Sequence, residues 1–281
     1  MSWNVANKVC LITGANTGIG RVTAIELARS GAKLILAGRS EERTRPVLDE
    51  IRAAGGTADF LPLDLGEFAS VRQCAEAFLA RKEPLDLLIL NAGLAGSRGL
   101  TRDGFEVHFG TNHLGHFLLT CLLRERLIES QPARIVVVSS RAHYRPKKLD
   151  FDAVKMTTPS VTGVAEYGVS KLANVLFAAE LSRRLAGTGI TTYSLHPGVV
   201  ASDVWRRVPW PFRALMKLAM ITNEEGARTT LHCATDPGLA SETGRYYDRS
   251  APKRPSRLAD DAALAADLWR RSEAWCGCRW G

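Results

Sequence analysis

Tyr167 and Lys171 stand four residues apart at the start of a long stretch whose apolar periodicity predicts a helix. Residues four apart on a helix share one face, so the phenol and the ammonium are expected to be neighbours. A nearby positive charge favours the phenolate and lowers the pKa of a tyrosine from about 10 toward the neutral range, where proton transfer is efficient. The pair therefore predicts general acid/base chemistry. The alternative is an interfacial tyrosine beside a surface lysine on an amphipathic helix.

Two further polar features precede this pair along the chain. The run Val136–Ser140 (VVVSS) predicts a strand that ends in two serine hydroxyls. Asn112 lies in the helical stretch before that strand. Because the tyrosine and the lysine do not stand alone, the chemical interpretation is favoured over the structural one.

A glycine-rich octapeptide, Thr13–Gly20 (TGANTGIG), lies between the first predicted strand and a helical pattern that starts at Arg21. Gly14 permits a tight turn, Gly18 lets the backbone approach an anion, and Gly20 allows the helix to pack closely on the strand. The N–H groups at the helix start would then face a pyrophosphate. No Gly-Lys-Ser/Thr sequence closes the loop, which argues against a nucleoside triphosphatase. An ordinary glycine-rich turn is the alternative, and the position after the first strand disfavours it.

The end of the second predicted strand indicates which dinucleotide would bind. A carboxylate that bonds the ribose of NAD is expected about 20 residues beyond the glycines, and Gly38 stands where the acid would be. Arg39 and Ser40 offer a guanidinium and a hydroxyl to a 2′-phosphate instead. The sequence therefore predicts NADP(H). The alternative is a solvated Arg39, with Glu41 or Glu42 reaching the ribose, although these acids also suit the start of the next helix.

Two more strand ends complete the expected nucleotide site. Asp64, followed by Leu65, ends the third strand and is placed to accept a hydrogen bond from an adenine amino group. Asn91, Ala92 and Gly93 end the fourth strand and are small enough for the backbone to lie against the adenosine ribose. Plain turn chemistry at strand ends is the alternative for both.

The scaffold for these groups is predicted by short runs of Val, Ile and Leu that alternate with longer amphipathic stretches. Continuous apolarity within the runs indicates parallel strands covered on both faces. We expect a single-domain α/β Rossmann fold, doubly wound, with a mostly parallel seven-stranded sheet and helices on both faces. The expected strands are Lys8–Thr13, Lys33–Ala37, Ala58–Leu63, Leu85–Leu90, Arg134–Ser139, Ile190–Leu195 and Gly244–Asp248, and the expected helices include Arg21–Ser30, Glu41–Ala54, Ser70–Arg81 and Phe105–Glu129.

Two segments, 143–163 and 202–222, interrupt this alternation after predicted strand ends. Ligands of open α/β sheets bind outside the carboxyl ends of the strands, so both insertions are candidate substrate walls. Segment 202–222 mixes tryptophans with arginines and is expected to form a lid over an apolar substrate. A peripheral membrane contact through the same segment and a helix packed on the core are the alternatives.

The 281 residues, 46 % hydrophobic and 23 % charged, suffice for one large domain and exclude a disulfide-stabilised miniprotein. Six scattered cysteines and the lack of a signal-peptide pattern indicate a reducing compartment, so a cytoplasmic location is expected. The net charge of +8 favours anionic partners such as a phosphorylated cofactor. The basic residues form no block with interleaved aromatics, so no nucleic-acid partner is expected. No apolar window reaches the about 20 residues that span a bilayer.

Other reactive side chains suggest no further chemistry. His108, His113 and His116 have no acid or cysteine at recognised ligand spacing, so we expect packing roles and no metal site. Cys276 and Cys278 match neither a zinc ribbon nor a CxxC redox pair, and solvent-exposed tail thiols are expected. The chain lacks a GxSxG motif, which argues against a serine hydrolase.

These motifs together resemble the short-chain dehydrogenase/reductase family. TGANTGIG, LNAG around Asn91, Asn112, VVVSS, YGVSK from Tyr167 and HPG at His196–Gly198 occur in the order of that family and cover almost the whole chain. HLGHFLLT from His113, YGVSKLANVLF, TTYSLHPGVV, LHCA and GRYYD make the chain similar to the retinol dehydrogenase group.

The resemblance implies a role for each matching residue. Tyr167 is the proton donor and acceptor, Lys171 lowers its pKa and binds ribose, Ser140 polarises the carbonyl, and Asn112 supports a water-linked proton path. Ser140 is preferred to Ser139 because the reactive serine of the family is usually the last of the pair. The implied cofactor contacts are Gly14, Asn16, Thr17, Gly18, Ile19, Gly20, Arg39, Asp64, Leu65, Asn91, Ala92, Gly93, Tyr167, Lys171, Pro197, Gly198, Val200 and Ser202.

The implied activity is NADP(H)-dependent interconversion of an alcohol and a carbonyl, with retinol and retinal or another long apolar aldehyde as substrate. Steroid or other lipid carbonyls are the enzymatic alternative, and a catalytically silent dinucleotide-binding module is the non-enzymatic one. Membrane-bound members carry an N-terminal anchor, whereas this chain begins close to its first strand, so a soluble or peripheral enzyme is expected. The resemblance also implies a homodimer built on the helices that hold Asn112 and Tyr167.

Overall fold

The structure, a computed structural model, describes residues 3–198 and 221–281 of the chain. Within these residues, eight strands form one sheet in the order β3-β2-β1-β4-β5-β6-β7-β8. The neighbours from β3 to β7 are parallel, and β8 is antiparallel to β7. The strands are β1 (Val9–Thr13), β2 (Lys33–Gly38), β3 (Thr57–Pro62), β4 (Leu87–Leu90), β5 (Ala133–Val138), β6 (Ile190–His196), β7 (Arg245–Asp248) and β8 (Ala251–Pro252).

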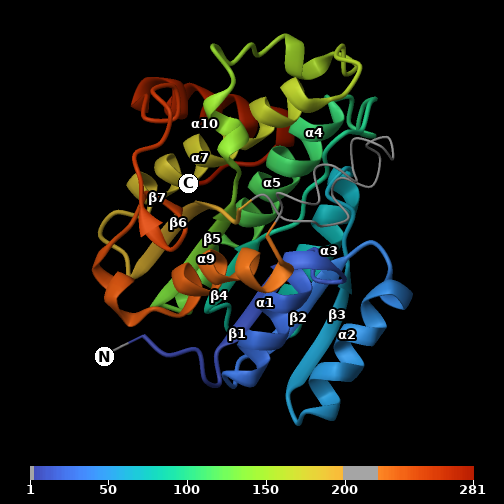
Figure 1. Ribbon diagram of the computed structural model, residues 1–281, viewed down its shortest axis with the longest axis vertical. Helices are drawn as coiled ribbons and strands as arrows, with labels where there is room; N and C mark the ends of the chain where they lie inside the picture. The colour runs from blue at the N-terminus through green and yellow to red at the C-terminus, as the bar shows by residue number, and fades with distance from the viewer. Residues whose placement is uncertain (1–2, 199–220) are drawn as a thin grey trace.

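Helices cover both faces of this sheet (Figure 1). Leu11 and Ile135 pack in one apolar cluster, whereas their chain neighbours Ile12 and Val136 pack in the other. Strands buried on both sides explain the continuous apolar runs of the sequence and confirm the doubly wound α/β prediction. One cluster includes α1 (Gly18–Arg29), α2 (Glu41–Ala53) and α9 (Asn223–Thr235), and the other includes α3 (Phe68–Ala80), α5 (Gly115–Leu122), α7 (Val164–Arg184) and α10 (Ala262–Cys276).

The sheet has eight strands in the described residues, one more than the seven predicted. β8 folds back on β7 through a two-residue turn in which Arg249 and Ser250 have φ angles of 54° and 58°. Positive φ at both central residues matches the twist of two antiparallel strands. The sequence lacks the Asn-Gly or Asp-Gly signal of such a turn, and a two-residue strand has no periodicity to detect.

The point where the strand order reverses lies between β1 and β4. β1 pairs with β2 on one side and with β4 on the other, although β4 is far along the chain. In doubly wound sheets the crevice outside the carboxyl ends of such strands binds the ligand. The glycine loop after β1 and the segment Asn91–Gly93 after β4 therefore lie side by side at this crevice.

The predicted helix Phe105–Glu129 is divided into four pieces. A π-helical turn interrupts it, with the N–H of Gly115 bonded to the carbonyl of Gly110, five residues back. Such a turn shifts the register by one residue and is often found at functional sites. The pieces are α4 (Val107–Phe109), the π turn η1 (Gly110–Leu114), α5 and α6 (Arg124–Glu129).

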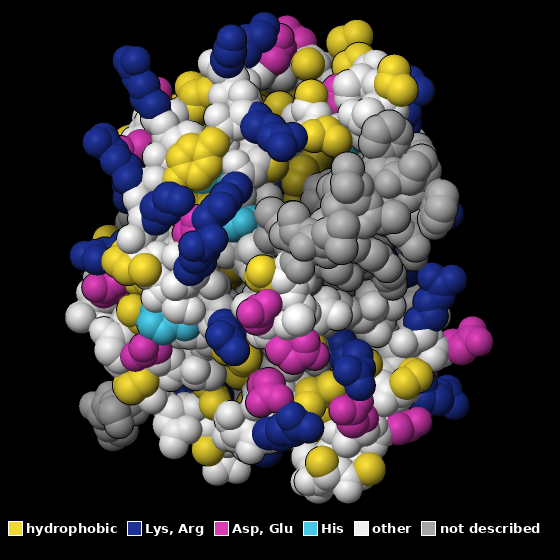
Figure 2. Space-filling model, in the orientation of Figure 1, with side chains coloured by type: hydrophobic (Ala, Val, Ile, Leu, Met, Phe, Trp, Pro, Cys, Tyr) yellow, Lys and Arg dark blue, Asp and Glu magenta, His cyan; other side chains and the backbone are white. Residues whose placement is uncertain are grey.

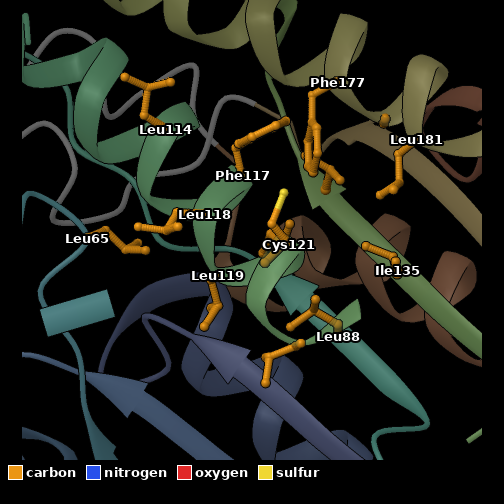
Figure 3. Packing of buried hydrophobic residues seen from close by; sticks show 14 of the residues in the cluster. Leu65, Leu88, Leu114, Phe117, Leu118, Leu119, Cys121, Ile135, Phe177 and Leu181 are labelled. Atoms are coloured by element: carbon orange, nitrogen blue, oxygen red, sulfur yellow. The ribbon is translucent and has the colours of Figure 1, made fainter. Parts of the chain in front are cut away.

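Helix α10 covers α5 and α7. The ring of Trp269 lies 4.9 Å from that of Phe117 on α5 and 5.8 Å from that of Phe177 on α7, centroid to centroid. Figure 3 shows Phe117 and Phe177 next to each other in this cluster. The expected homodimer would use α7 and the helical stretch that holds Asn112 and continues into α5, and α10 packs on both of these helices.

The two insertions differ in what the structure shows. Segment 143–163 contains the 3-10 turns η2 (Arg141–Tyr144) and η3 (Ala153–Lys155) and leads into α7. Of segment 202–222, residues 202–220 lie outside the described residues, and so do the expected lid and membrane contact. None of the described helices combines the length and the apolar character needed to cross a membrane.

The C-terminal cysteines are not the solvent-exposed thiols that were expected. Cys276 ends α10 and is 2 % exposed, and Cys278 is partly buried. Gly277, with φ 59°, turns the chain back at the helix end, and Arg72 bonds the Cys276 carbonyl at 2.6 Å. The thiols of Cys121 and Cys276 both bond that of Cys278 and lower its pKa. No pattern in the sequence predicts that Cys121 of α5 lies here.

Candidate active site

A cleft of about 520 Å³ opens along the carboxyl ends of the parallel strands. Seventeen of the predicted site residues that the structure describes line it together with their neighbours, although they come from segments far apart in the chain. These residues are Gly14, Asn16, Thr17, Gly18, Ile19, Gly20, Arg39, Asp64, Leu65, Asn91, Ala92, Gly93, Ser140, Tyr167, Lys171, Pro197 and Gly198. Asn112 lies behind the wall, and Val200 and Ser202 lie outside the described residues.

The glycine loop is packed so tightly that side chains are excluded. Gly14 has a φ of 71°, and a Cβ on Gly20 would lie 2.2 Å from the Gly14 carbonyl oxygen and 2.5 Å from Nδ2 of Asn91. Nδ2 of Asn91 donates to the carbonyls of Thr13 and Gly14 at 2.9 and 3.0 Å. The first turn of α1 has no acidic residue, so its positive dipole end faces the cleft without a competing carboxylate. The loop fits the pyrophosphate of a dinucleotide.

The end of β2 presents two arginines to the cleft. Arg39 lines it as predicted, and Arg43, one helical turn later on α2, joins it. Ser40 has another role, because its hydroxyl accepts the N–H of Arg43 at 3.3 Å and caps α2. Glu41 pairs with Arg45 at 3.5 Å and does not line the cleft. The sequence did not predict Arg43, because its position in the cleft lining depends on the direction of α2.

The residues after β3 and β4 form a further part of the cleft lining. Oδ1 of Asp64 accepts the N–H of Gly66 at 2.9 Å, so this oxygen shapes the turn, as the alternative interpretation held. Leu65 is 5 % exposed and packs beneath the cleft floor. A Cβ on Gly93 would lie 3.4 Å from both Oδ1 of Asn112 and Nζ of Lys171. The segment after β4 is therefore in close contact with two of the predicted catalytic residues.

Helix α7 brings Tyr167 and Lys171 to the cleft on one face, as their spacing predicted. Tyr167 is 8 % exposed and Lys171 is 3 % exposed. Nζ of Lys171 lies 5.7 Å from the centre of the tyrosine ring and donates to the Val138 carbonyl at 3.0 Å. The end of β5 thus fixes the ammonium beside the phenol.

The two serines after β5 have different partners. Oγ of Ser139 donates to the Lys171 carbonyl at 2.7 Å and is buried. Oγ of Ser140 accepts the N–H of Ala142 at 3.2 Å and is hydrogen-bonded to Tyr167. Ser140 is therefore the serine whose hydroxyl lies with the phenol, which supports the choice made from the family pattern.

The pKa of Tyr167 differs from the expectation. Burial raises the phenol pKa above 10, and the Ser140 hydrogen bond and the charge of Arg145 offset only part of that rise. Burial also lowers the pKa of Lys171 to about 8. The spacing predicts only the attraction of the ammonium, whereas the loss of solvation in the folded protein disfavours the charged form of both groups. In this structure the phenol therefore keeps its proton at neutral pH.

Asn112 lies in the π turn η1 and is fully buried. Its Oδ1 accepts the Leu94 N–H at 2.9 Å, and its Nδ2 donates to the Leu94 carbonyl and to Oγ of Ser170, both at 3.0 Å. Ser170 in turn donates to the Tyr167 carbonyl at 2.8 Å. Asn112 thus joins the segment after β4 to the helix that carries the tyrosine.

A buried polar cluster beside Tyr167 was not recognised from the sequence. Glu106, 2 % exposed, accepts from Nδ1 of His108 at 2.8 Å and from the Thr158 hydroxyl at 2.5 Å. The His108 ring lies edge-on to the Tyr167 ring at 6.3 Å. A Cβ on Gly163, whose φ is 67°, would lie 2.6 Å from the Ser97 carbonyl. The cluster anchors insertion 143–163 to the cleft wall, and only the packing of the two segments reveals it.

Fold and site together define a dinucleotide-binding oxidoreductase. The family model for short chain dehydrogenase matches residues 8–210. The chain belongs to this family, whose members bind a nicotinamide dinucleotide and act on small alcohols or carbonyl compounds.

Curated relatives extend the similarity over nearly the full length. Retinol dehydrogenase 12 of Mus musculus is 43 % identical over 98 % of this chain and 88 % of that protein. Retinol dehydrogenase 11 of Homo sapiens is 44 % identical over 93 % of this chain and 83 % of that protein. Dehydrogenase/reductase SDR family member 13 of Bos taurus is 43 % identical over 98 % and 74 %. The predicted likeness to retinol dehydrogenases is confirmed.

Solved structures show the same fold. An uncharacterised protein from Mycobacterium paratuberculosis superposes with a TM-score of 0.80 at 34 % identity, covering 100 % of this chain and 97 % of that one. A short chain dehydrogenase from Salmonella enterica has a TM-score of 0.71 at 25 % identity, covering 88 % and 97 %. Both comparisons agree with the layered arrangement in Figure 1.

Proposed function

We propose that this protein is an NADP(H)-dependent oxidoreductase that interconverts a long apolar alcohol and its aldehyde, with retinol and retinal as the leading pair. One observation carries the proposal: Ser140, Tyr167 and Lys171 meet at the cleft that the glycine loop also lines. The names of the retinol dehydrogenase relatives support the substrate class. Leu94 and Leu100 give the cleft an apolar wall that suits such a substrate.

In reduction, Ser140 and Tyr167 both donate hydrogen bonds to the substrate carbonyl oxygen. When bound, NADPH supplies the hydride that the carbonyl carbon accepts. Tyr167 then gives its proton to the alkoxide oxygen, and the raised pKa of the phenol means that this proton is present at neutral pH. Lys171, with a pKa lowered to about 8, is still mainly protonated at pH 7 and stabilises the phenolate that remains.

Mutation of the tyrosine tests this assignment. Tyr167→Phe removes the proton but keeps the ring, so we expect NADPH to bind while kcat falls by about 10²- to 10⁴-fold. Tyr144→Phe is a matched control, because its hydroxyl bonds the Arg254 carbonyl at 2.6 Å and the residue does not line the cleft. Turnover of Tyr167→Phe at the wild-type rate would refute the acid/base role.

The cofactor preference rests on Arg39 and Arg43. Two guanidinium groups favour a 2′-phosphate, and the acids at the start of α2 do not line this part of the cleft. We expect a lower KM for NADPH than for NADH and, in Arg39→Ala/Arg43→Ala, an increase of about tenfold or more in the KM for NADPH alone. A wild-type preference for NADH would overturn the NADP(H) assignment.

The substrate class is tested by following NADPH oxidation with retinal, medium-chain aldehydes and steroid ketones under identical conditions. The proposal expects retinal or another long apolar aldehyde to have the highest kcat/KM. Highest activity with steroids would support the lipid-carbonyl alternative. Tight NADPH binding without turnover of any of these compounds would favour the binding module instead. Cytoplasmic location and homodimer formation stay predictions.

A further inference from the structure

We propose that His116 is a positioning residue that connects the end of β1, where the glycine loop begins, to Asn112 in the π turn. Its two ring nitrogens bond Thr13, at the end of β1, and the Asn112 carbonyl, in the π turn. The inference rests on the proposed function, because it assigns His116 a role in arranging that same site. The sequence alone predicts only a packing role for this histidine.

The Thr13 hydroxyl determines one side of the connection. Its oxygen accepts the N–H groups of Asn91 and Ala92, both at 3.0 Å, so both of its lone pairs are occupied. The hydroxyl lies 2.9 Å from Nε2 of His116, and its one proton is left for that nitrogen. Nε2 must therefore be the unprotonated acceptor.

The Asn112 carbonyl determines the other side. Nδ1 of His116 lies 3.0 Å from this oxygen, which can only accept, so Nδ1 must carry the ring proton. The two bonds require the same neutral tautomer of the ring. Burial lowers the pKa of His116 to about 3, and the nearby charge of Lys171 acts in the same direction, so the ring stays neutral at physiological pH.

Asn112 passes this restraint to both halves of the site. Its amide bonds the backbone of Leu94 and the hydroxyl of Ser170, which bonds the carbonyl of Tyr167. A chain of contacts thus runs from the N–H groups after β4, through Thr13 and His116, to the backbone of Asn112, and from the side chain of Asn112 to the turn of α7 that holds the phenol. Every side chain along it is buried.

Such a chain is important because the reaction rate depends steeply on the positions of the reacting groups. Displacing a reacting group by about 1 Å can cost about 10²-fold in rate. The glycine loop and α7 belong to segments about 150 residues apart, as their numbering shows. The ring of His116 sets the directions of two bonds, one to Thr13 and one to the Asn112 carbonyl. Through them it links the two segments.

The first experiment reads the tautomer and needs neither cofactor nor substrate. Protein labelled with ¹⁵N-histidine is studied by long-range ¹H–¹⁵N NMR from pH 6 to 8, and the His116 signals are assigned by their loss in His116→Leu. We expect a neutral ring protonated at Nδ1. A ring protonated at Nε2, a charged ring, or rapid exchange between tautomers would overturn the proposal.

The second experiment separates the two bonds. His116→Asn places an amide N–H near the Nδ1 position and keeps the bond to Asn112, whereas His116→Gln reaches the Nε2 position and keeps an acceptor for Thr13. We expect His116→Leu to lose about 10- to 100-fold in kcat. His116→Asn should recover kcat better than NADPH affinity, and His116→Gln should recover NADPH affinity better than kcat.

His113→Leu is the matched control. His113 is also buried and lies one turn earlier, but its Nε2 faces the hydroxyl of Ser272 on α10 at 3.1 Å, away from the cleft. We expect this variant to lose stability and keep kcat and NADPH affinity within about twofold of the wild type. If His116→Leu affects kcat and NADPH affinity no more than His113→Leu does, the positioning role is wrong.

Failure of the proposed function is distinguishable from failure of this inference. If the wild-type protein turns over no alcohol or aldehyde, the proposed activity is wrong, and the inference is judged on the tautomer and on NADPH affinity. If the wild type is active, the inference requires the Nδ1–H tautomer and the kinetic split together. Either result missing would overturn it.

Discussion

Ser139 and Ser140 are neighbours with the same side chain, yet their hydroxyls lie in different environments. Both hydroxyls bond α7, but one meets its backbone and the other meets a side chain. Ser139 bonds the Lys171 carbonyl, and Ser140 bonds Tyr167. At the scale of single residues, function here depends on the partner rather than on the residue type.

This difference predicts opposite effects for two alanine substitutions. Ser140→Ala removes the hydroxyl that we propose to contact the substrate oxygen, and we expect a loss of about 10²-fold in kcat. Ser139→Ala removes a buried hydrogen bond, and we expect a loss of about 1 kcal/mol in stability. Steady-state kinetics and urea denaturation of both variants measure these effects. A larger loss of kcat in Ser139→Ala would reverse the assignment.

At the scale of elements, the cleft is held together by one contact between irregular segments and one contact between helices. Insertion 143–163 bonds to the segment around α4 through Thr158 and through the Val154 carbonyl, which accepts the Glu106 N–H at 2.8 Å. On the far side of the site, α10 covers α5 and α7. Both contacts support the cleft wall from behind.

Glu106 is the centre of the first contact. Burial alone would raise its pKa, but hydrogen bonds from His108 and Thr158 and the N–H of Phe109 lower it below 4.5. A carboxyl with a lowered folded-state pKa stabilises the fold above its unfolded pKa, and this stability is lost as the pH falls through the folded value. We therefore expect Glu106→Gln to cost about 2 kcal/mol at pH 7 and progressively less below pH 4.5.

Urea denaturation of wild type and Glu106→Gln at pH 7, 5 and 4 measures this difference. Glu129→Gln serves as the control, because the Glu129 side chain is 66 % exposed in its pair with Arg126, and its cost is expected to be under about 1 kcal/mol at each pH. A Glu106→Gln effect as small as that of the control at pH 7 would show that the cluster does not hold the insertion.

Trp269 is the centre of the second contact. The side chain is 1 % exposed and packs between aromatic rings of α5 and α7. We expect Trp269→Ala to reduce the unfolding free energy by about 3–5 kcal/mol, because it leaves a large cavity, and Trp269→Phe to cost less. Thermal and urea unfolding measure both. Equal stability of Trp269→Ala and wild type would mean that α10 is not part of the cooperative fold.

At the scale of the whole molecule, several histidines are enclosed by the two apolar clusters and the sheet. Burial lowers the pKa of His113 and His116 to about 3 and that of His196 to about 4, so all three are neutral in the folded protein. Charged side chains lie on the surface instead. Figure 2 shows Lys and Arg side chains distributed over the visible face together with Asp and Glu. Net positive charge and buried neutral histidines both make the fold sensitive to acid.

The sign of this pH dependence follows from the protons bound. Below an unfolded pKa near 6.5, the unfolded chain binds protons that the folded protein does not, so stability falls as the pH falls. Each histidine contributes about 1.4 kcal/mol per pH unit in that range. We expect the urea midpoint to be nearly constant from pH 7 to 8 and to drop steeply between pH 6 and 5. A smaller slope in His113→Leu checks the cause, and a flat profile would contradict it.

The sequence by itself determined the parts of this protein that local patterns encode. The glycine loop after β1, the alternation of strands and helices and the Tyr167–Lys171 spacing each lie within one short segment, and the structure has them where they were expected. A turn of backbone or one face of a helix depends on near neighbours, so their residue types are sufficient to predict it.

Only the tertiary structure decided which distant groups meet and how well they are solvated. Arg43 enters the cleft, Cys121 joins the C-terminal thiols, and His116 bonds both Thr13 and Asn112 because elements far apart in the chain pack together. The pKa of Tyr167 rises for the same reason, since its desolvation is set by what covers it. Burial and long-range contact are properties of packed elements, and no single segment of sequence contains them.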